Sequence, residues 1–532
     1  MQPKTLGLMI DCSRNAVMKP AQVKDFAKLI AGMGYNMLQL YTEETYEVEN
    51  EPYFGYMRGR YTVEELQDID AYCRSIGVEL VPCIQTLAHL SHLTRWDPYW
   101  DRFDCNDILL IDDERVYELI DHMFATLAKA FSSRRIHIGM DEAHFVGLGR
   151  YLDQHGYCNR SELLSKHLAR VKEIADKYQF TPMMWSDMYI CLSNHGQYYS
   201  ENPVVPQEVV DGVPEGVELV YWDYYSTDKK HYDTMFDAHA KFRNSTVFAG
   251  GIWTWTGYTP SIRYSLDASE AAMRSALERD VDTVFFTMWG DDGKDCSYYM
   301  QLAGMFAAAQ FAQGNFDRAD IAKKFEEYTG YSFEEALNLE LPNLLDDTDE
   351  PHYKNPNKYL LFNDVFIGLF DYNQSVDAAQ KYATYAKTLA ASVNGRRYDY
   401  LFLLEQKLCE VLAIKCDLGV RIRTAYKAGD KKALAELLAT DFPALNTALA
   451  EFYAAFETVW YTENKAFGFE VQEARLGALM QRVKGCERRL RAYLDGTLET
   501  IDELDVEHIP HWPNVENQTV VYNSWIGSIS AC

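Results

Sequence analysis

Two adjacent acids, Asp141 and Glu142, directly follow an apolar run of strand length at residues 135–139. At the end of a buried strand, one carboxyl group can transfer protons while its neighbour stays ionised and stabilises positive charge. Acid pairs are common in a chain with 79 acidic and 51 basic residues, and the cluster at residues 112–114 is interpreted as no more than a helix start. The position after a strand singles out Asp141 and Glu142.

Tryptophan ends or follows each of four consecutive apolar runs, at Trp185, Trp222, Trp253 and Trp289, and Trp255 lies two residues beyond Trp253. Sugar-binding sites use aromatic faces to stack on the C–H surfaces of the ring, and pockets in general are rich in aromatic side chains. Packing in a barrel core is the usual alternative for Trp. Their regular place at the strand ends favours a sugar pocket.

A repeating series of predicted strands and helices positions the acid pair and the tryptophans. Between residue 5 and about residue 310, strand-length apolar runs alternate with segments of helical period, the pattern of repeated βα units. Parallel strands joined by crossover helices close into a (β/α)8 TIM barrel, with the active site at the C-terminal strand ends. The predicted strands are residues 5–11, 35–41, 78–83, 135–139, 182–185, 217–222, 247–252 and 283–288. Expected helices include residues 21–33, 63–76, 114–131, 160–178 and 268–278.

Strand signals stop after about residue 330, and long helical stretches follow at residues 376–393, 398–428 and 471–494. We therefore predict an α/β fold with two domains. They are a catalytic (β/α)8 barrel over residues 1–325 and a mainly α-helical C-terminal domain over residues 326–532, whose residues 519–529 form a short extended tail.

Composition limits the class of partner. A net charge of -28 argues against nucleic acid, and no segment approaches the roughly 20 apolar residues that a membrane span needs. The 11 cysteines stand singly, without a CxxC pair or a His/Cys cluster, so we expect neither a metal site nor a cofactor. The N-terminal residues lack the pattern of a secretory signal, which predicts a cytoplasmic location.

The segment His-Ile-Gly-Met-Asp-Glu at residues 137–142 resembles the His-x-Gly-Gly-Asp-Glu motif of glycoside hydrolase family 20, the β-N-acetylhexosaminidases. Arg14 falls where that family has its strand-one arginine, and residues 82–89 resemble its strand-three segment. The tryptophans of the fifth, sixth and eighth strands also follow the family's order. The resemblance covers roughly the first 310 residues and requires several motifs in a fixed order.

The chain departs from that family's pattern at several positions. Met140 replaces the second glycine, Ala88 replaces the Gly before His89, Gln85 stands at an acidic position, and Asp291 stands where many members have Glu. The seventh strand ends in Trp instead of Tyr. Because the first predicted strand starts almost at the first residue given, we expect the small α/β domain that precedes many members' barrels to be missing. These departures indicate a divergent, intracellular branch, and they concern aglycone specificity more than chemistry.

Ordinary retaining glycosidases place two carboxyl groups about 5 Å apart across the scissile bond, which adjacent residues of one strand cannot easily do. The resemblance implies instead that the substrate's 2-acetamido group attacks C1 and forms an oxazolinium ion, which water opens with net retention. It implies that Glu142 is the general acid and that ionised Asp141 orients the acetamido group. Tyr224, which shares strand parity with Trp222, is the candidate donor to the acetamide oxygen, and Tyr225 is the alternate.

The resemblance also implies a closed pocket for one terminal sugar, and therefore exo action on β-linked GlcNAc or GalNAc. Arg14 would clamp the 3- and 4-hydroxyl groups and Asp291 the 4- and 6-hydroxyl groups, while the five tryptophans would wall the ring and the acetamide methyl group. His89 either supports the neighbouring site residues or contacts the ligand, and the sequence does not decide between these two roles. His137 is expected to be a buried histidine that orients its neighbours.

Several alternatives stay open at this stage. Glu43, Glu44 and Asp187 are either supporting groups or charges at the rim of the site. The chain could instead be a retaining β-glycosidase with a protein nucleophile such as Asp223 or Asp291, or a non-catalytic sugar-binding barrel. The choice between GlcNAc and GalNAc is open. The helical region either completes the aglycone site or forms a dimer interface, and of these we predict the homodimer.

Overall fold

The computed structural model describes residues 2–346, 348 and 350–525, and these form two compact units. The first unit comprises Met1–Ile252, Ser265–Met288 and Gly304–Ile321. The second comprises Trp253–Tyr264, Trp289–Ala303 and Ala322–Cys532. Two short segments that follow barrel strands therefore group with the helical unit. The domain boundary at residues 325 and 326 stays a prediction.

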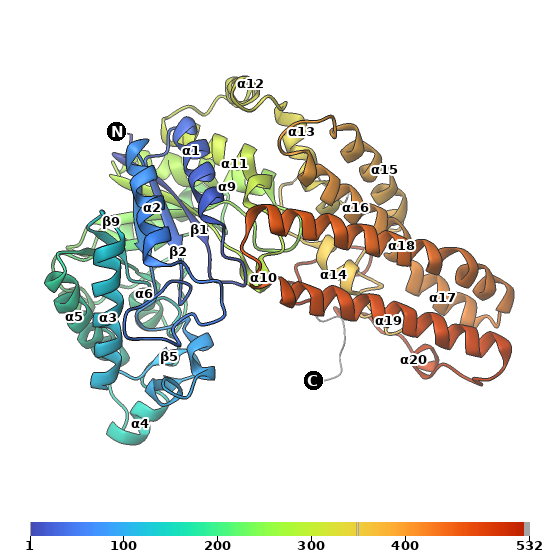
Figure 1. Ribbon diagram of the computed structural model, residues 1–532, viewed down its shortest axis with the longest axis horizontal. Coiled ribbons are helices and arrows are strands. Elements are labelled where there is room, and N and C mark those ends of the chain that lie inside the picture. Colours follow the sequence, from blue (N-terminus) through green and yellow to red (C-terminus); the bar gives the residue numbers. More distant parts are fainter. Residues whose placement is uncertain (1, 347, 349, 526–532) are drawn as a thin grey trace. The chain divides into compact units, whose positions relative to one another are not determined.

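Within the described part of the chain, eight parallel strands close into a barrel in the order β1-β10-β9-β8-β7-β6-β3-β2. They are β1 (Thr5–Asp11), β2 (Met37–Tyr41), β3 (Glu79–Cys83), β6 (Arg135–His137), β7 (Thr181–Trp185), β8 (Glu218–Trp222), β9 (Thr246–Gly251) and β10 (Thr283–Met288). Figure 1 labels β1, β2 and β9 of this barrel together with several of its helices. Every predicted strand is confirmed, so the chain has the (β/α)8 fold. A small antiparallel pair, β4 (Phe103–Cys105) and β5 (Ile108–Leu109), is too short to give a periodic signal and was not predicted.

The crossover helices carry ordinary start signals. Thr62 forms a capping box with Glu65 at the start of α2, and Asp113 accepts the N–H of Arg115 at the start of α3, as the acidic cluster indicated. The main helices are α1 (Pro20–Met33), α2 (Val63–Ser75), α3 (Glu114–Ala130), α5 (Arg160–Lys177), α8 (Lys229–His239), α9 (Ile262–Glu278) and α11 (Leu302–Ala312). Shorter ones are α4 (Arg150–His155), α6 (Asp187–Ser193), α7 (Gln207–Gly212), α10 (Asp291–Lys294), η1 (Ser91–Arg95), η2 (Trp100–Arg102) and η3 (Tyr298–Gln301).

The C-terminal region is helical, as predicted. Its elements are α12 (Arg318–Thr329), α13 (Phe333–Leu337), η4 (Asn338–Asn343), α14 (Pro356–Phe362), α15 (Ala378–Ala391), α16 (Asp399–Lys415), α17 (Leu418–Lys427), α18 (Lys431–Glu463), α19 (Phe469–Asp495) and α20 (Asp502–Asp505). The stretch predicted as one helix at 398–428 is interrupted after Lys415, where Gln374 donates to the carbonyl of Cys416.

The predicted tail is tied to the helical unit as far as the structure describes it. Thr519 donates to Asp346 through its backbone N–H at 3.0 Å, and the N–H of Tyr522 donates to Asn355 at 2.8 Å. No regular helix or strand is assigned between residues 519 and 525. Residues 526–529 of that prediction lie outside the described residues.

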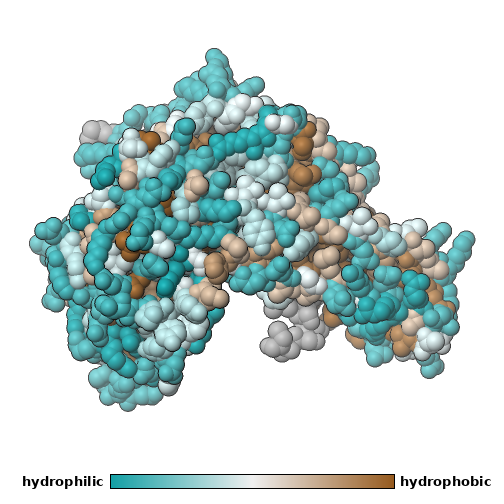
Figure 2. Space-filling model, in the orientation of Figure 1, coloured by the Kyte–Doolittle hydropathy of each residue, from teal (hydrophilic) through white to brown (hydrophobic). Residues whose placement is uncertain are grey.

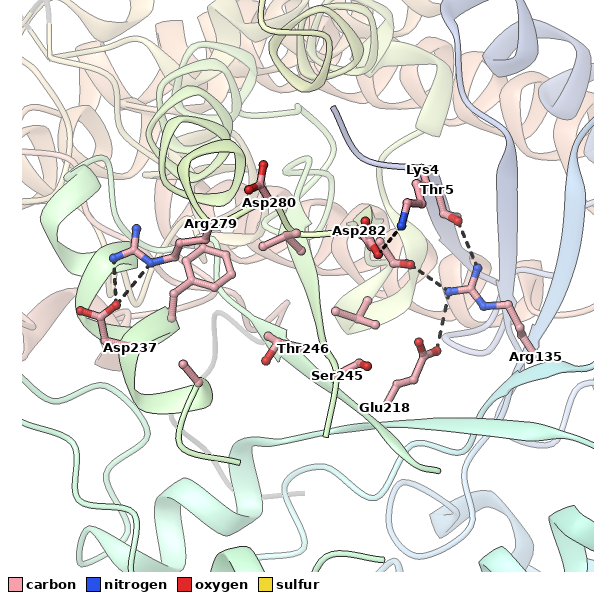
Figure 3. Close-up of a pocket in the computed structure, with 15 residues that line it drawn as sticks. Lys4, Thr5, Arg135, Glu218, Asp237, Ser245, Thr246, Arg279, Asp280 and Asp282 are labelled. Atoms are coloured by element: carbon pink, nitrogen blue, oxygen red, sulfur yellow. Dashed lines mark hydrogen bonds and ion pairs between the residues drawn. The ribbon is translucent and has the colours of Figure 1, made fainter. Parts of the chain in front are cut away.

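A pocket of about 670 Å³ opens at the N-terminal end of the barrel, opposite the end where the predicted site lies (Figure 3). Its cations already have acidic partners. Lys4 contacts Asp282 at 2.8 Å, Arg279 contacts Asp237 at 2.9 Å, and the guanidinium of Arg135 lies 3.8 Å from Glu218. We therefore assign these charges to closing the base of the barrel.

The surface agrees with the acidic composition. On the face shown in Figure 2, hydrophilic residues predominate over the barrel unit, and hydrophobic residues are scattered among them. Of the helices that the structure describes, none has both the length and the apolar character that a membrane span requires.

Candidate active site

The turn after β6 carries the acid pair in an unusual backbone conformation. Gly139, Met140 and Glu142 have φ values of 71°, 74° and 51°, in the left-handed region that disfavours residues with a Cβ atom. Gly139 suits this turn, because an added Cβ would lie 2.0 Å from Oε1 of Gln85. Nδ1 of His137 accepts the Gly139 N–H at 3.1 Å, so this fully buried histidine orients the turn as expected.

Asp141 is held as an anion by two neighbours from the segment after β3. Gln85 donates to Oδ1 at 2.7 Å, and Nε2 of His89 lies 3.2 Å from Oδ2. Burial alone would raise the pKa of Asp141, but the charge and hydrogen bond of His89 outweigh it, and the Gln85 hydrogen bond adds to them. The resulting pKa is lowered to about 2. Asp141 is therefore ionised at neutral pH.

Glu142 has the opposite electrostatic environment. Burial raises the pKa of its carboxyl, and the neighbouring charge of Asp141 raises it further. Half of the side chain remains accessible to solvent, and its Oε2 lies 3.6 Å from Nε2 of His89. Its backbone N–H donates to Oδ2 of Asp187 at 3.0 Å. The two adjacent acids thus differ in proton affinity in the direction that an acid and an electrostatic stabiliser require.

His89 lies beside both acids and is protonated. Burial opposes the charged form, but Asp141 more than offsets it and raises the pKa of His89 to about 10. Together with Asp141 and Glu142 it forms a set of donor atoms that all lie within 4.8 Å of one another, as a metal site would need. Because the neighbouring carboxylate favours the protonated imidazole, we assign the contact between His89 and Asp141 to an ion pair.

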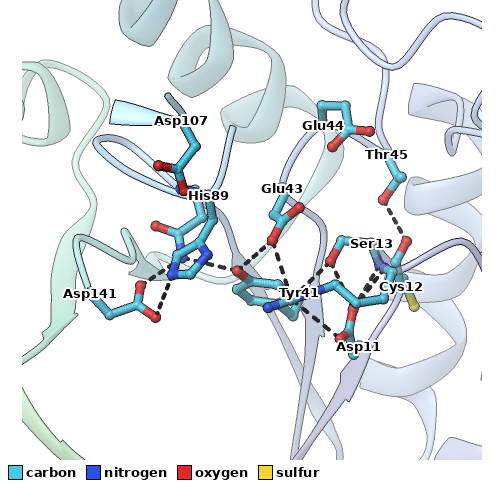
Figure 4. Close-up of polar contacts among 12 residues, drawn as sticks. Asp11, Cys12, Ser13, Tyr41, Glu43, Glu44, Thr45, His89, Asp107 and Asp141 are labelled. Carbon is cyan, nitrogen blue, oxygen red and sulfur yellow. Dashed lines mark hydrogen bonds and ion pairs between the residues drawn. The ribbon is translucent and has the colours of Figure 1, made fainter. Parts of the chain in front are cut away.

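A chain of polar contacts connects Arg14 to Asp141, and Figure 4 shows Asp11, Tyr41, Glu43 and Asp141 along it. Arg14 lies 3.2 Å from Glu43 and 3.3 Å from Asp11, and the Tyr41 hydroxyl donates to Glu43 at 2.9 Å. Gln85 donates to the same Tyr41 oxygen at 3.0 Å. Asp11 and Glu43 thus hold the predicted residue Arg14 in place at the C-terminal ends of β1 and β2, and Glu43 is a supporting group.

Gln85 and Tyr41 were not among the predicted site residues. Both stand at or just beyond a strand end, which is the signal that could have identified them. Gln85 was noted in the sequence only as a departure from an acidic position. In the structure its amide bridges Asp141 and Tyr41, a geometry that needs a neutral donor.

The aromatic residues of β7 and β8 occupy different surroundings. Trp185 is buried in the barrel against His137, with ring centroids 4.3 Å apart. Trp222 stacks on Tyr224 at 5.3 Å and packs on Tyr198 at 4.7 Å. Tyr224 is 7% exposed and Tyr225 is 43% exposed, so Tyr225 is the more accessible of the two candidate donors.

The remaining predicted residues belong to the second unit. Trp253 and Trp255 stack on each other at 4.3 Å, and Thr254 donates to the carbonyl of Trp289 at 2.7 Å. Asp291 is the first residue of α10. Their predicted contacts with a sugar remain predictions.

Family models match two parts of the chain. Residues 6–205 match the catalytic domain of glycosyl hydrolase family 20, and residues 336–522 match the glycoside hydrolase 20C C-terminal domain. The chain belongs to glycoside hydrolase family 20. The second match lies in the helical region.

Individual relatives are distant. Beta-hexosaminidase 3 of Arabidopsis thaliana is 23% identical over 226 residues, which are 40% of this chain and 41% of the relative. Hexosaminidase D of Homo sapiens is 23% identical over 222 residues, 40% of this chain and 43% of the relative. The chain thus matches about two fifths of the length of these curated relatives. A solved β-N-acetylhexosaminidase from Bacteroides fragilis has 17% identity and a TM-score of 0.46, covering 62% of this chain and 71% of that one.

Proposed function

We propose that this family 20 member is an exo-β-N-acetylhexosaminidase that releases terminal β-linked GlcNAc or GalNAc. The observation that carries the proposal is the difference between two adjacent carboxyl groups. Asp141 has a lowered pKa between Gln85 and His89, whereas the pKa of Glu142 is raised. Because the two acids are adjacent on one turn, they cannot easily straddle the scissile bond as a general acid and a protein nucleophile would, and the nucleophile is expected to come from elsewhere.

In the proposed mechanism the nucleophile is the substrate's acetamido oxygen. Glu142 protonates the leaving oxygen as the acetamido oxygen attacks C1, and a cyclic oxazolinium ion forms. Asp141 accepts the acetamide N–H, directs the carbonyl oxygen to C1 and stabilises the developing positive charge. Glu142, now ionised, then takes a proton from the water that opens the ring, and the product keeps its β configuration.

The predicted sugar contacts complete the proposal. Arg14 would donate to the 3- and 4-hydroxyl groups, and Asp291 would accept from the 4- and 6-hydroxyl groups. Tyr224 or Tyr225 would donate to the acetamide oxygen. The ring and the methyl group would lie against tryptophans, for which we retain Trp185, Trp222, Trp253, Trp255 and Trp289.

A protein nucleophile is the main rival. Asp223 is the nearest candidate along the chain, but Oδ2 already accepts from Tyr221 and contacts His231, each at 2.7 Å. Its Oδ1 accepts the N–H of Tyr225 at 3.3 Å. Both oxygens of this carboxylate are thus held by other groups, which argues against Asp223 as the nucleophile, while Asp291 stays the other candidate.

Substrate choice tests the proposal. We expect turnover of aryl N-acetyl-β-glucosaminides or β-galactosaminides, inhibition by a thiazoline mimic of the oxazoline, and far slower hydrolysis of the aryl β-glucoside. Glu142→Gln should lower kcat by about 10²- to 10⁴-fold, the range for loss of a general acid. Equal rates on the glucoside would refute substrate assistance, and a fully active Glu142→Gln would refute the assignment of the acid.

Two further predictions from the sequence stay in place. The helical region would form a homodimer, which the mass in solution tests. The protein would be cytoplasmic, which fractionation of the source cells tests.

A further inference from the structure

Asp187 is a buried acid that the mechanism above does not use. It is the first residue of α6, two residues beyond the end of β7, and it has no solvent exposure. Its Oδ2 accepts the backbone N–H of Glu142 at 3.0 Å, although the two residues are 45 positions apart in the chain. Its Oδ1 is buried and has no hydrogen-bond partner among the described residues.

This hydrogen bond holds the backbone N–H of Glu142, the proposed general acid. Glu142 has a φ of 51°, a conformation that is unfavourable for a residue with a Cβ atom and persists only where the surroundings impose it. The hydrogen bond from its N–H to Asp187 is one such constraint. Without it, the Glu142 backbone could relax toward negative φ, and its carboxyl would then leave the position beside Asp141.

We propose that Asp187 is a positioning residue for the general acid and acts by accepting the Glu142 N–H at a fixed place. This inference rests on the proposed function, because it assigns Asp187 a role only through Glu142. Asp187 itself is not expected to touch the substrate.

The electrostatic surroundings favour a neutral Asp187. Burial raises the pKa of its carboxyl to about 8, and the charges of Asp141 and of the Glu142 carboxyl raise it further. The N–H of Glu142 and a weaker contact with the Trp222 side chain lower it. Cys191 and Tyr198 are further titratable groups that face Asp187. An oxygen without a hydrogen-bond partner is also less costly to bury in a neutral carboxyl than in a carboxylate. At neutral pH, Asp187 therefore supplies an acceptor without placing a third negative charge beside the acid pair.

Two substitutions separate position from charge. Asp187→Asn keeps an oxygen that can accept the Glu142 N–H and is always neutral, whereas Asp187→Ala removes the acceptor. We expect Asp187→Ala to lower kcat by about tenfold or more, with a smaller change in KM. We expect Asp187→Asn to keep most of kcat and to leave the alkaline limb of the pH profile, which reports Glu142, unmoved below pH 8.

Asp70→Ala is the matched control. Asp70 is also buried in the barrel unit, and it accepts a backbone N–H, that of Ser132 at 3.2 Å, away from the acid pair. It should lower the melting temperature without lowering kcat. The three variants are compared with the wild type on an aryl N-acetyl-β-glucosaminide, and folding is checked by circular dichroism.

The outcomes distinguish the possible failures. A folded Asp187→Ala with wild-type kcat overturns the inference. An Asp187→Asn variant as impaired as Asp187→Ala also overturns it, because an acceptor at this place would then be insufficient. If Asp187→Ala does not fold, the kcat and the pH profile of Asp187→Asn still test the inference. A shift of the alkaline limb to lower pH in Asp187→Asn would show that Asp187 acts through its charge, which also overturns it. A wild-type protein without turnover would refute the proposed function, and this inference with it.

Discussion

Gly139→Ala is the substitution for which the structure makes the sharpest prediction. The glycine has a φ of 71°, and a Cβ atom there would lie 2.0 Å from Oε1 of Gln85 and 2.8 Å from the carbonyl oxygen of Ile84. Gln85 would have to move, and it is the residue that donates to Asp141 and accepts the N–H of Met140.

Two contributions determine the magnitude. Placing Ala in the left-handed region costs roughly 1–2 kcal/mol. Displacing Gln85 weakens one hydrogen bond to a charged group, about 1.5–3 kcal/mol, and one neutral bond, about 0.5–1.5 kcal/mol. The variant should therefore lose roughly 3–6 kcal/mol of unfolding free energy, and kcat/KM should fall because Asp141 loses its donor.

Gly77→Ala provides the control for backbone strain. Gly77 has a φ of 76°, and an added Cβ would meet no atom within 4 Å. It should lose only the conformational contribution, about 1–2 kcal/mol, and keep full activity. Urea unfolding at pH 7 and initial rates on an aryl N-acetyl-β-glucosaminide measure both quantities. If the two glycine variants lose the same unfolding free energy and the same activity, the assignment of Gln85 as the link between the turn and Asp141 is wrong.

Two further predictions concern the partners of Asp141. Gln85→Leu should raise the pKa of Asp141 and lower kcat/KM by about tenfold to a hundredfold, because Asp141 loses a hydrogen-bond donor. Gln67→Leu, at an exposed position, is the control and should leave kcat/KM unchanged. A fully active Gln85→Leu would contradict the role of the Gln85 amide. His89 has a folded pKa of about 10, above the unfolded value of 6.5, so its contribution to stability is complete below pH 6.5 and is lost as the pH rises to 10. Urea midpoints should therefore decline more steeply over this range for the wild type than for His89→Gln, and parallel declines would contradict the ion pair.

The sequence alone was sufficient to predict the barrel and to propose where its chemistry takes place. Strands buried on both faces require near-continuous apolar runs, so each strand was visible as a local pattern, and its end could be read directly. The acid pair, Arg14 and the strand-end tryptophans followed from those ends. The motif at residues 137–142 indicated the family, which the family models then showed.

The partners of those residues were decided by the tertiary structure. Gln85 reaches Asp141 because Cys83 pairs with His137 across β3 and β6, and Asp187 reaches the Glu142 N–H because β7 lies beside β6. Such register places residues tens of positions apart within hydrogen-bond distance, and no local pattern encodes it. The opposite pKa shifts of Asp141 and Glu142 likewise arise from burial and from charges brought together by folding. The sequence by itself determined which groups stand at the mouth of the barrel, whereas only the fold determined which of them hold a proton.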